Sequence, residues 1–291
     1  MSWFSGPSVA GRKVLITGAA RGIGAALAAR LAARGAHVAL LGLEPELLAE
    51  VAAECGDAPW RYCDVADRAQ VERVVEALVG ELGGLDVLVT NAGIAKQMVM
   101  IGGDPSVLEE TLAVNVLGAV YAVQAAGRHI ARPGGYVLMM SSISTAVQLP
   151  LAGAYSASAA AIEALGNTLR GELRASGAKV GISYFAEIDT DMTRRGFGTA
   201  AAHTVLREIS LTGTSPIGPA VDALERAIAR RRKVVVSPWW VTLVLPVRPL
   251  AQLVLQRVLG NRVARALEIA RTEDAPFTTT QPARPRRMER R

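Results

Sequence analysis

KVLITGAARGIG, residues 13–24, is the stretch of this sequence that decides the fold. The apolar run Val14–Ile16 predicts a buried parallel strand, and the alanine- and leucine-rich run 22–34 predicts a helix packed on a sheet. Three glycines leave the turn between them free of side chains: Gly18, Gly22 and Gly24. A strand, a glycine turn and a helix N-terminus suit the pyrophosphate of a dinucleotide, although a tight turn in any α/β protein gives the same pattern.

The overall composition indicates a globular α/β protein. The 291 residues are 51% hydrophobic and 20% charged, enough for a large core. Of the net charge of +6, the last ten residues contribute +4, from five arginines and one glutamate, so no nucleic-acid partner is indicated. Two cysteines, Cys55 and Cys63, predict neither a disulfide framework nor a metal site. Residues 1–12 lack the apolar core of a signal peptide, which favours a cytoplasmic location.

Apolar runs alternate with helical patterns along the chain. The predicted strands are Val14–Ile16, His37–Gly42, Trp60–Asp64, Asp86–Thr90, Gly135–Met140 and Lys179–Phe185. The predicted helices are 22–34, 44–55, 68–82, 105–132 and 154–175. This alternation predicts a Rossmann-type, doubly wound parallel sheet in a single α/β domain over residues 10–236, after the N-terminal segment 1–12.

An apolar C-terminal extension, residues 237–271, follows this domain. The uncharged run 234–247 contains Trp239 and Trp240 but is broken by prolines, so it is too short to span a membrane. One interpretation is a last core strand followed by apolar helices that cover a substrate cleft. The other is a peripheral membrane segment over 234–259, with the tryptophans at the interface and Arg230–Lys233 at the head groups. The Thr-, Pro- and Arg-rich tail 272–291 is predicted to be disordered.

Further polar groups follow successive predicted strands, at the edge where open α/β sheets bind ligands. They are Asp64-Val65, Asn91-Ala92-Gly93, Ser141-Ser142 and Tyr155, with Asn115 in the long helix between them. Together with Thr17-Gly18 and Gly22-Ile23-Gly24, and with a serine thirteen residues before a tyrosine, this pattern over residues 10–236 resembles the short-chain dehydrogenase/reductase family.

The resemblance implies an NAD(P)-dependent oxidoreductase. By resemblance, Ser142 holds the substrate carbonyl, Tyr155 passes the proton, and Asn115 holds a water that continues the proton relay. The positions that would bind the cofactor are Thr17, Gly18, Arg21, Gly22, Ile23, Gly24, Asp64, Val65, Asn91, Ala92, Gly93, Ile188 and Thr190. The usual Pro-Gly before the last two is replaced by Ala186-Glu187, which leaves the path of that loop open.

Ala159 stands where the family has a lysine that binds the nicotinamide ribose and lowers the tyrosine pKa. Residues four apart share a helix face, so position 159 lies beside Tyr155. Without a cation there, we expect impaired catalysis. Because Asn115, Ser142 and Tyr155 are kept, an engineered replacement of the lysine is favoured over natural loss. A natural pseudoenzyme that binds NAD(P) as a sensor or interaction module is the alternative.

The sequence also gives expectations for the cofactor preference, the substrate class and the assembly. Gly42 ends the second predicted strand, where NAD-preferring relatives carry a carboxylate, and Arg21 lies where NADP-preferring relatives meet the 2′-phosphate, so NADP is favoured over NAD. Apolar residues near the expected cleft indicate a small lipophilic alcohol or carbonyl substrate: Ile94, Met98, Met100, Val147, Leu149 and Leu151. Relatives pair through the helices corresponding to 105–132 and 154–175, which implies a homodimer or homotetramer.

Overall fold

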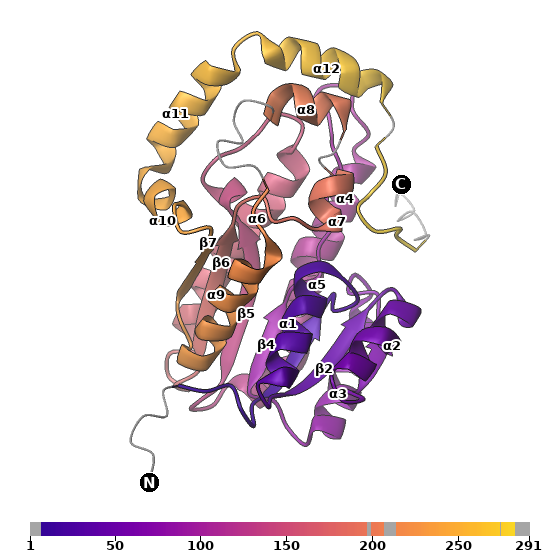
Figure 1. The fold of residues 1–291 in the computed structure, drawn as a ribbon, viewed down its shortest axis with the longest axis vertical. Coiled ribbons are helices and arrows are strands. Elements are labelled where there is room, and N and C mark those ends of the chain that lie inside the picture. The colour runs from indigo at the N-terminus through magenta and orange to yellow at the C-terminus, as the bar shows by residue number, and fades with distance from the viewer. Residues whose placement is uncertain (1–6, 197–198, 207–213, 274, 283–291) are drawn as a thin grey trace, which may run out of the picture.

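One parallel sheet of seven strands, in the order β3-β2-β1-β4-β5-β6-β7, forms the centre of the protein (Figure 1). The computed structural model describes residues 7–196, 199–206, 214–273 and 275–282. The strands are β1 (Lys13–Thr17), β2 (His37–Gly42), β3 (Trp60–Tyr62), β4 (Val87–Thr90), β5 (Tyr136–Ser142), β6 (Lys179–Phe185) and β7 (Val234–Ser237). The apolar runs predicted as strands are confirmed, and β7 is the last core strand expected after residue 233.

Strand β1 is the point where the strand order changes direction. Val14 pairs with Val38 of β2 on one side and with Val87 of β4 on the other. The chain therefore leaves β1 first toward one edge of the sheet and later toward the other, so the loops after β1 and β4 separate at the carboxyl ends of the strands. Such a switch point opens a crevice there.

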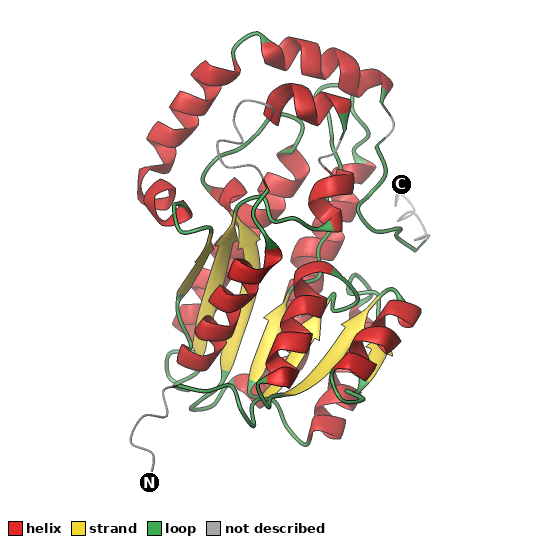
Figure 2. Ribbon diagram, in the orientation of Figure 1, coloured by secondary structure: helices red, strands yellow, loops and turns green. Residues whose placement is uncertain are grey.

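Helices cover both faces of the sheet (Figure 2). Helices α1 (Gly22–Ala33), α2 (Pro45–Glu54) and α9 (Ile217–Arg230) pack on one face around Ile16, Leu40 and Leu138. Helices α3 (Arg68–Leu82), α5 (Gly118–Ile130) and α6 (Gly153–Glu172) pack on the other. Three short elements lie near the carboxyl edge: η2 (Ile143–Thr145), α7 (Asp191–Gly196) and α8 (Ala200–Leu206). This arrangement confirms the doubly wound α/β prediction.

The predicted long helix 105–132 contains an irregular turn. It is divided into α4 (Ser106–Leu112), a π-helical turn η1 (Ala113–Leu117) and α5. A π turn adds a residue to the helical repeat and changes the direction of the side chains within it. The composition of 113–117 does not differ from that of an ordinary helix, so the sequence does not reveal the turn.

The C-terminal extension forms an arch over the carboxyl end of the sheet (Figure 1). It consists of α10 (Val241–Val244), η3 (Leu245–Val247), α11 (Arg248–Leu259) and α12 (Arg262–Thr272). Its inner side packs through Leu255, Leu259 and Ala266 on Leu151 and on α8. The packing of this inner side on the body supports the interpretation that apolar helices cover a cleft.

The prediction of a disordered tail over 272–291 is wrong for its first part. Helix α12 extends to Thr272, and residues 275–282 lie against the body of the protein. Ala275 and Thr278 are buried, and Phe277 packs at the edges of two hydrophobic clusters. The Phe277 ring and these two buried residues supply the contacts that dock the segment. The arginines at 284–291 lie outside the described residues.

Candidate active site

A crevice at the carboxyl ends of β1, β2 and β4 contains most of the predicted cofactor residues. Its open space is ≈ 880 Å³, solvent at its mouth included. Ten predicted residues line it: Gly18, Arg21, Gly22, Ile23, Asp64, Val65, Asn91, Ala92, Gly93 and Thr190. They come together because the loops after parallel strands emerge at the same edge of the sheet.

Thr17, Gly24 and Ile188 form the frame of the crevice but do not line it. The Thr17 hydroxyl accepts hydrogen bonds from the amides of Asn91 and Ala92, at 3.0 and 2.9 Å. The Asn91 side-chain amide donates to the carbonyls of Thr17 and Gly18, at 3.0 Å each. A Cβ on Gly24 would lie 2.3 Å from the Gly18 oxygen, so only glycine permits this close approach. Ile188 is buried and forms a parallel bridge with Ser215.

The N-terminus of α1 opens into the crevice. Arg21, its N-cap residue, makes no side-chain capping hydrogen bond, and the first turn contains no acidic residue. A helix start without a cap leaves backbone N–H groups that favour a bound anion. A Cβ at Gly18 would lie 2.6 Å from Ala92 Cα, so the turn also brings two backbone segments into contact. These residues fit the pyrophosphate of a nicotinamide dinucleotide.

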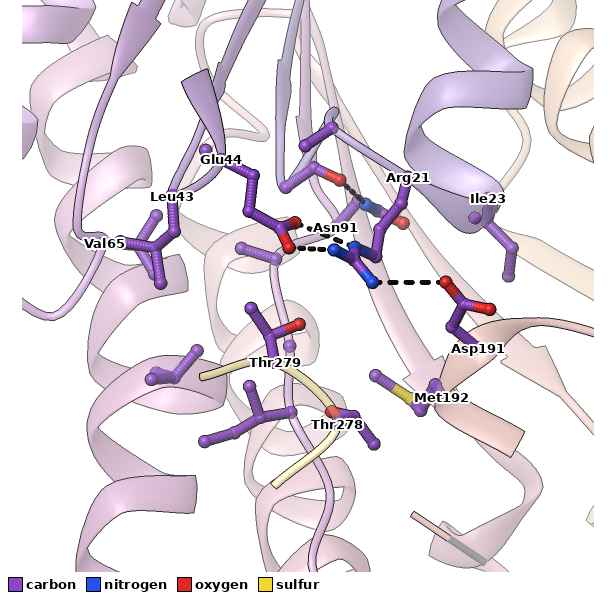
Figure 3. Close-up of a pocket in the computed structure, with 18 of the residues that line it drawn as sticks. Arg21, Ile23, Leu43, Glu44, Val65, Asn91, Asp191, Met192, Thr278 and Thr279 are labelled. Carbon is purple, nitrogen blue, oxygen red and sulfur yellow. Dashed lines mark hydrogen bonds and ion pairs between the residues drawn. The ribbon is translucent and has the colours of Figure 1, made fainter. Parts of the chain in front are cut away.

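Arg21 is held by two carboxylates across the crevice (Figure 3). Its Nε donates to Glu44 at 2.8 Å, a second guanidinium nitrogen also bonds Glu44, and a third contact reaches Asp191 at 3.2 Å. Glu44 is the N-cap residue of α2, and Asp191 begins α7. A 2′-phosphate at this position would compete with Glu44 for the guanidinium. The sequence placed Arg21 in the site but did not indicate these two partners.

Asn115 lies in the π turn and connects three parts of the site. Its Oδ1 accepts from the Ile94 amide at 2.8 Å, and its Nδ2 donates to the Ile94 carbonyl at 3.0 Å. The same nitrogen donates to Ser158 Oγ at 3.0 Å, and Ser158 donates to the Tyr155 carbonyl at 2.7 Å. Both amide hydrogens are therefore used, so the side chain positions the crevice wall and α6. Ser158 was not among the predicted residues.

Tyr155 and Ser142 form a hydrogen-bonded pair at the start of α6. Burial raises the pKa of the Tyr155 phenol, and the hydrogen bond with Ser142 offsets part of that shift. Ser142 Oγ also accepts from the Ser144 amide at 3.1 Å. Neither side chain lines the crevice, although Tyr155 is expected at the same edge of the sheet. Ser142 is buried, and the partly exposed Tyr155 lies beside it. A protonated tyrosine and a serine hydroxyl can together donate hydrogen bonds to a carbonyl oxygen.

Ala159 follows one turn after Tyr155 and is buried, at 5% exposure. Ser141 Oγ donates to its carbonyl at 2.9 Å, which attaches the end of β5 to α6. Burial and Ser142 are the two influences on the Tyr155 pKa, and no cation of the described chain lowers it. The phenol therefore stays protonated through the neutral range.

The C-terminal tail contributes residues that were not predicted. Thr278, Thr279 and Gln281 line the crevice, and Figure 3 shows both threonines facing it. Lys96 lies over the Phe277 ring, 5.4 Å from its centroid. Composition alone assigned this segment to disorder, and no local signal in the sequence indicates where it docks.

Comparison with known proteins connects this geometry to a family. Residues 12–201 match the family model described as short chain dehydrogenase. The chain belongs to the short-chain dehydrogenase family. An uncharacterised oxidoreductase of Mycobacterium tuberculosis is 31% identical over 265 residues, covering 87% of this chain and 96% of the relative. An 11-beta-hydroxysteroid dehydrogenase-like protein of Arabidopsis thaliana is 33% identical, covering 82% of this chain and 73% of the relative.

Solved structures of short-chain dehydrogenases agree with the fold. A dehydrogenase/reductase from Sinorhizobium meliloti superposes with a TM-score of 0.72 at 29% identity, covering 79% of this chain and 94% of the other. A Burkholderia phymatum member, solved in complex with NAD, gives the same TM-score at 23% identity, over 82% and 93% of the two chains. Membership makes this chain an oxidoreductase of the short-chain dehydrogenase type.

Proposed function

We propose that this protein uses NAD(P) to interconvert a small lipophilic alcohol and its ketone or aldehyde. The crevice at the uncapped N-terminus of α1 is the observation that carries the proposal, because it fits a pyrophosphate. A bound nicotinamide would supply or accept the hydride. Gly18, Gly22 and the backbone of 91–93 would hold the dinucleotide, and Asn115 would keep the wall at Ile94 in place.

Tyr155 and Ser142 would handle the carbonyl oxygen and its proton. In reduction, Ser142 donates a hydrogen bond to the oxygen and the protonated Tyr155 gives it a proton. In oxidation, Tyr155 must accept that proton, and its raised pKa leaves little phenolate at neutral pH. The chain should therefore be a better reductase than dehydrogenase at neutral pH. Ala159 provides no cation to correct this difference, which is why we propose impaired turnover.

A lipophilic substrate is supported by the apolar surroundings of the Ser142 side. Val147, Leu149 and Leu151 follow Ser142 and pack with α11 and α12. Ile94 and Met98 are also buried, whereas Met100 is 70% exposed and does not belong to this lining. One relative carries the name of a hydroxysteroid dehydrogenase, which agrees with a lipophilic substrate here.

NADP is the cofactor that we propose as preferred. The backbone at Gly42 presents no carboxylate to a ribose diol, and among the described residues that line the crevice Arg21 carries a positive charge. Binding would require the 2′-phosphate to replace Glu44 at the guanidinium. NAD is the alternative, favoured by the Arg21–Glu44 pair that already occupies this position.

A homodimer through α5 and α6 is the proposed assembly, with a homotetramer as the extension. Leu117 and Leu165 are exposed at 45% and 36% on this side. The small exposed residues Ala157, Ala160 and Ala164 of α6 would permit close packing of two copies. Sedimentation at micromolar concentration tests this, and a monomer alone would contradict it.

Cofactor titration tests the proposed function. Energy transfer from tryptophan to NADPH or NADH should saturate, more tightly with NADPH. Failure of both to saturate at millimolar concentration would contradict the proposal. A pseudoenzyme is the second candidate, favoured by Ala159: it would bind cofactor but transfer no hydride to any carbonyl compound, whereas the proposed enzyme retains measurable reduction.

A further inference from the structure

The C-terminal arch carries a group of exposed apolar side chains that lie close together in the sequence, which we name the outer apolar patch. Its members are Trp239, Leu243, Val247, Leu250, Leu253, Val254 and Val258. Their exposed fractions run from 46% at Val247 to 74% at Trp239. They are seven of the thirteen exposed large hydrophobic residues in the described chain, within twenty residues of sequence. This concentration marks an interaction surface.

Helix α11 has two apolar sides with different surroundings. Leu255 and Leu259 face the body and are buried at 6% and 3%. Leu250, Val254 and Val258 follow one another at four-residue spacing and are about half exposed. The inner side explains how the arch is held on the body, but it leaves the outer side without a role in the folded chain.

The charge around the patch points to an anionic partner. From Val234 to Leu267 the chain contains four arginines, of which Arg248 is paired with Glu163, and the next carboxylate along the chain is Glu268 of α12. Arg257 and Arg265 are exposed, on α11 and α12. A second copy seated on α11 by two-fold symmetry would bring the Arg257 side chains of both copies together on a helix that carries no carboxylate. A membrane surface with anionic head groups meets both the apolar and the basic character.

By length and composition the stretch Val241–Leu259 could cross a bilayer, contrary to the expectation from the sequence, and it is only 11% buried, whereas Ser106–Ile130 is 39% buried. Two features favour an interfacial position of the segment over a transmembrane one. Its helix is interrupted by η3, with Pro246 and Pro249. At the same point Arg248 donates two hydrogen bonds to Glu163 of α6, at 3.0 and 2.8 Å, which ties the arch to the body.

We propose that the outer apolar patch docks on the surface of an anionic lipid bilayer, with α11 lying in the plane of the interface. Trp239, the most exposed member, would lie at the head-group level. The basic run Arg230–Lys233 does not take part, since it precedes β7 and lies at the amino end of the sheet, away from α10. This corrects the earlier expectation for those four residues. The proposal does not depend on the oxidoreductase activity.

Vesicle co-sedimentation of the full chain tests the proposal. The probes are phosphatidylcholine vesicles with and without phosphatidylglycerol. The wild type should sediment with the anionic vesicles, and the triple variant Leu250→Gln, Leu253→Gln, Val254→Gln should bind at least about tenfold more weakly. The double variant Arg257→Gln, Arg265→Gln should bind the anionic vesicles more weakly and should bind the pure phosphatidylcholine vesicles as the wild type does. Tyr62→Gln, an exposed apolar change on β3 at the opposite edge of the sheet, is the matched control and should bind as wild type.

The outcomes separate the possible occupants of the patch. Equal binding of wild type and triple variant would overturn the proposal, and so would equal binding to both vesicle types. If neither binds vesicles and the triple variant converts a dimer into a monomer, a second copy covers the patch and the proposal is wrong. Thermal unfolding and NADPH titration of each variant check that it is folded, and both measurements are independent of lipid binding.

Discussion

Ala95 and Thr278 are joined by a reciprocal pair of hydrogen bonds. The Ala95 amide donates to the Thr278 hydroxyl at 3.2 Å, and the Thr278 amide donates to the Ala95 carbonyl at 3.2 Å. The two residues are 183 positions apart in the sequence. This pair fixes the C-terminal tail on the loop after β4, so residues near the end of the chain form one wall of the crevice.

Removal of the tail should weaken cofactor binding. Deletion of residues 275–291 removes Thr278, Thr279 and Gln281 from the crevice, and we expect the NADPH dissociation constant to rise about tenfold, the equivalent of one or two lost contacts. Deletion of 283–291 alone leaves the wall in place and serves as the matched control. Calorimetric titration of both truncations measures the effect. Tighter binding after the longer deletion would show that the tail blocks the crevice instead of completing it.

Arg21 and Glu44 should set the choice between NADPH and NADH. Arg21→Gln should weaken NADPH binding by about tenfold or more and leave NADH nearly unchanged, because only NADPH carries the 2′-phosphate. Glu44→Gln should tighten NADPH binding, since it releases the guanidinium from its carboxylate partner. Parallel titrations of each variant with NADPH and with NADH give the ratio of the two dissociation constants. If Arg21→Gln weakened both cofactors equally, Arg21 would have no role in selecting the phosphate.

Gly42 offers a second test of the cofactor choice. A Cβ at this position would meet Leu48, Ala19 and Ala20 at 3.7–3.8 Å, which is ordinary contact, so Gly42→Asp should fold. Its carboxylate would approach the ribose diol and repel a 2′-phosphate. We expect the NADPH-to-NADH affinity ratio to fall by at least about tenfold. Gly42→Asn, of the same size without the charge, is the control and should shift the ratio much less.

Much of the fold and of the crevice could be predicted from the sequence. Buried strands such as His37–Gly42 were located to the residue, since parallel strands covered on both faces are continuous apolar runs. The residues after β1, β3 and β4 were expected together because parallel strands end at the same edge. Local patterns of this kind report on positions close in sequence.

The parts that were missed depend on contacts between distant segments. The docking of Thr278 on Ala95 and the bonds from Arg21 to Glu44 and Asp191 involve residues far apart in the chain. The polar composition of the tail is typical of disorder, but Phe277, the buried Ala275 and the Ala95–Thr278 hydrogen bonds hold it on the body. The π turn at Asn115 was missed since its residues have ordinary helical composition.

The link between Glu163 and Arg248 should make stability depend on pH. The Arg248 hydrogen bonds lower the pKa of Glu163, against an opposing effect of burial. A carboxylate with a lowered pKa stabilises the fold above its ordinary pKa, and this contribution is lost as the pH falls through the folded value. Glu163→Gln should lower the free energy of unfolding by about 1–3 kcal/mol at neutral pH.

The difference in the free energy of unfolding between wild type and Glu163→Gln should shrink in acid, because there the Glu163 carboxylate of the wild type is protonated as well. Urea unfolding at neutral and acidic pH measures it. Glu76→Gln, which breaks a pair with Arg128 on the exposed surface, is the control and should have a smaller effect. A constant difference across the whole pH range would contradict the assigned role of the Glu163 charge.

In the proposed reaction Tyr155 acts as the proton donor and acceptor beside a position that lacks a cation. The most direct test is the pH–rate profile of wild type, Ala159→Lys and Ala159→Met with NADPH and NADP on lipophilic ketones and secondary alcohols. We predict that wild-type oxidation rises toward alkaline pH, and that Ala159→Lys increases turnover by about a hundredfold or more and moves the profile to lower pH. Ala159→Met, with a side chain similar in length to lysine but uncharged, should neither increase turnover nor move the pH profile. If wild type, lysine and methionine variants turn over the same substrate equally well with the same profile, residue 159 has no catalytic role and the account is contradicted.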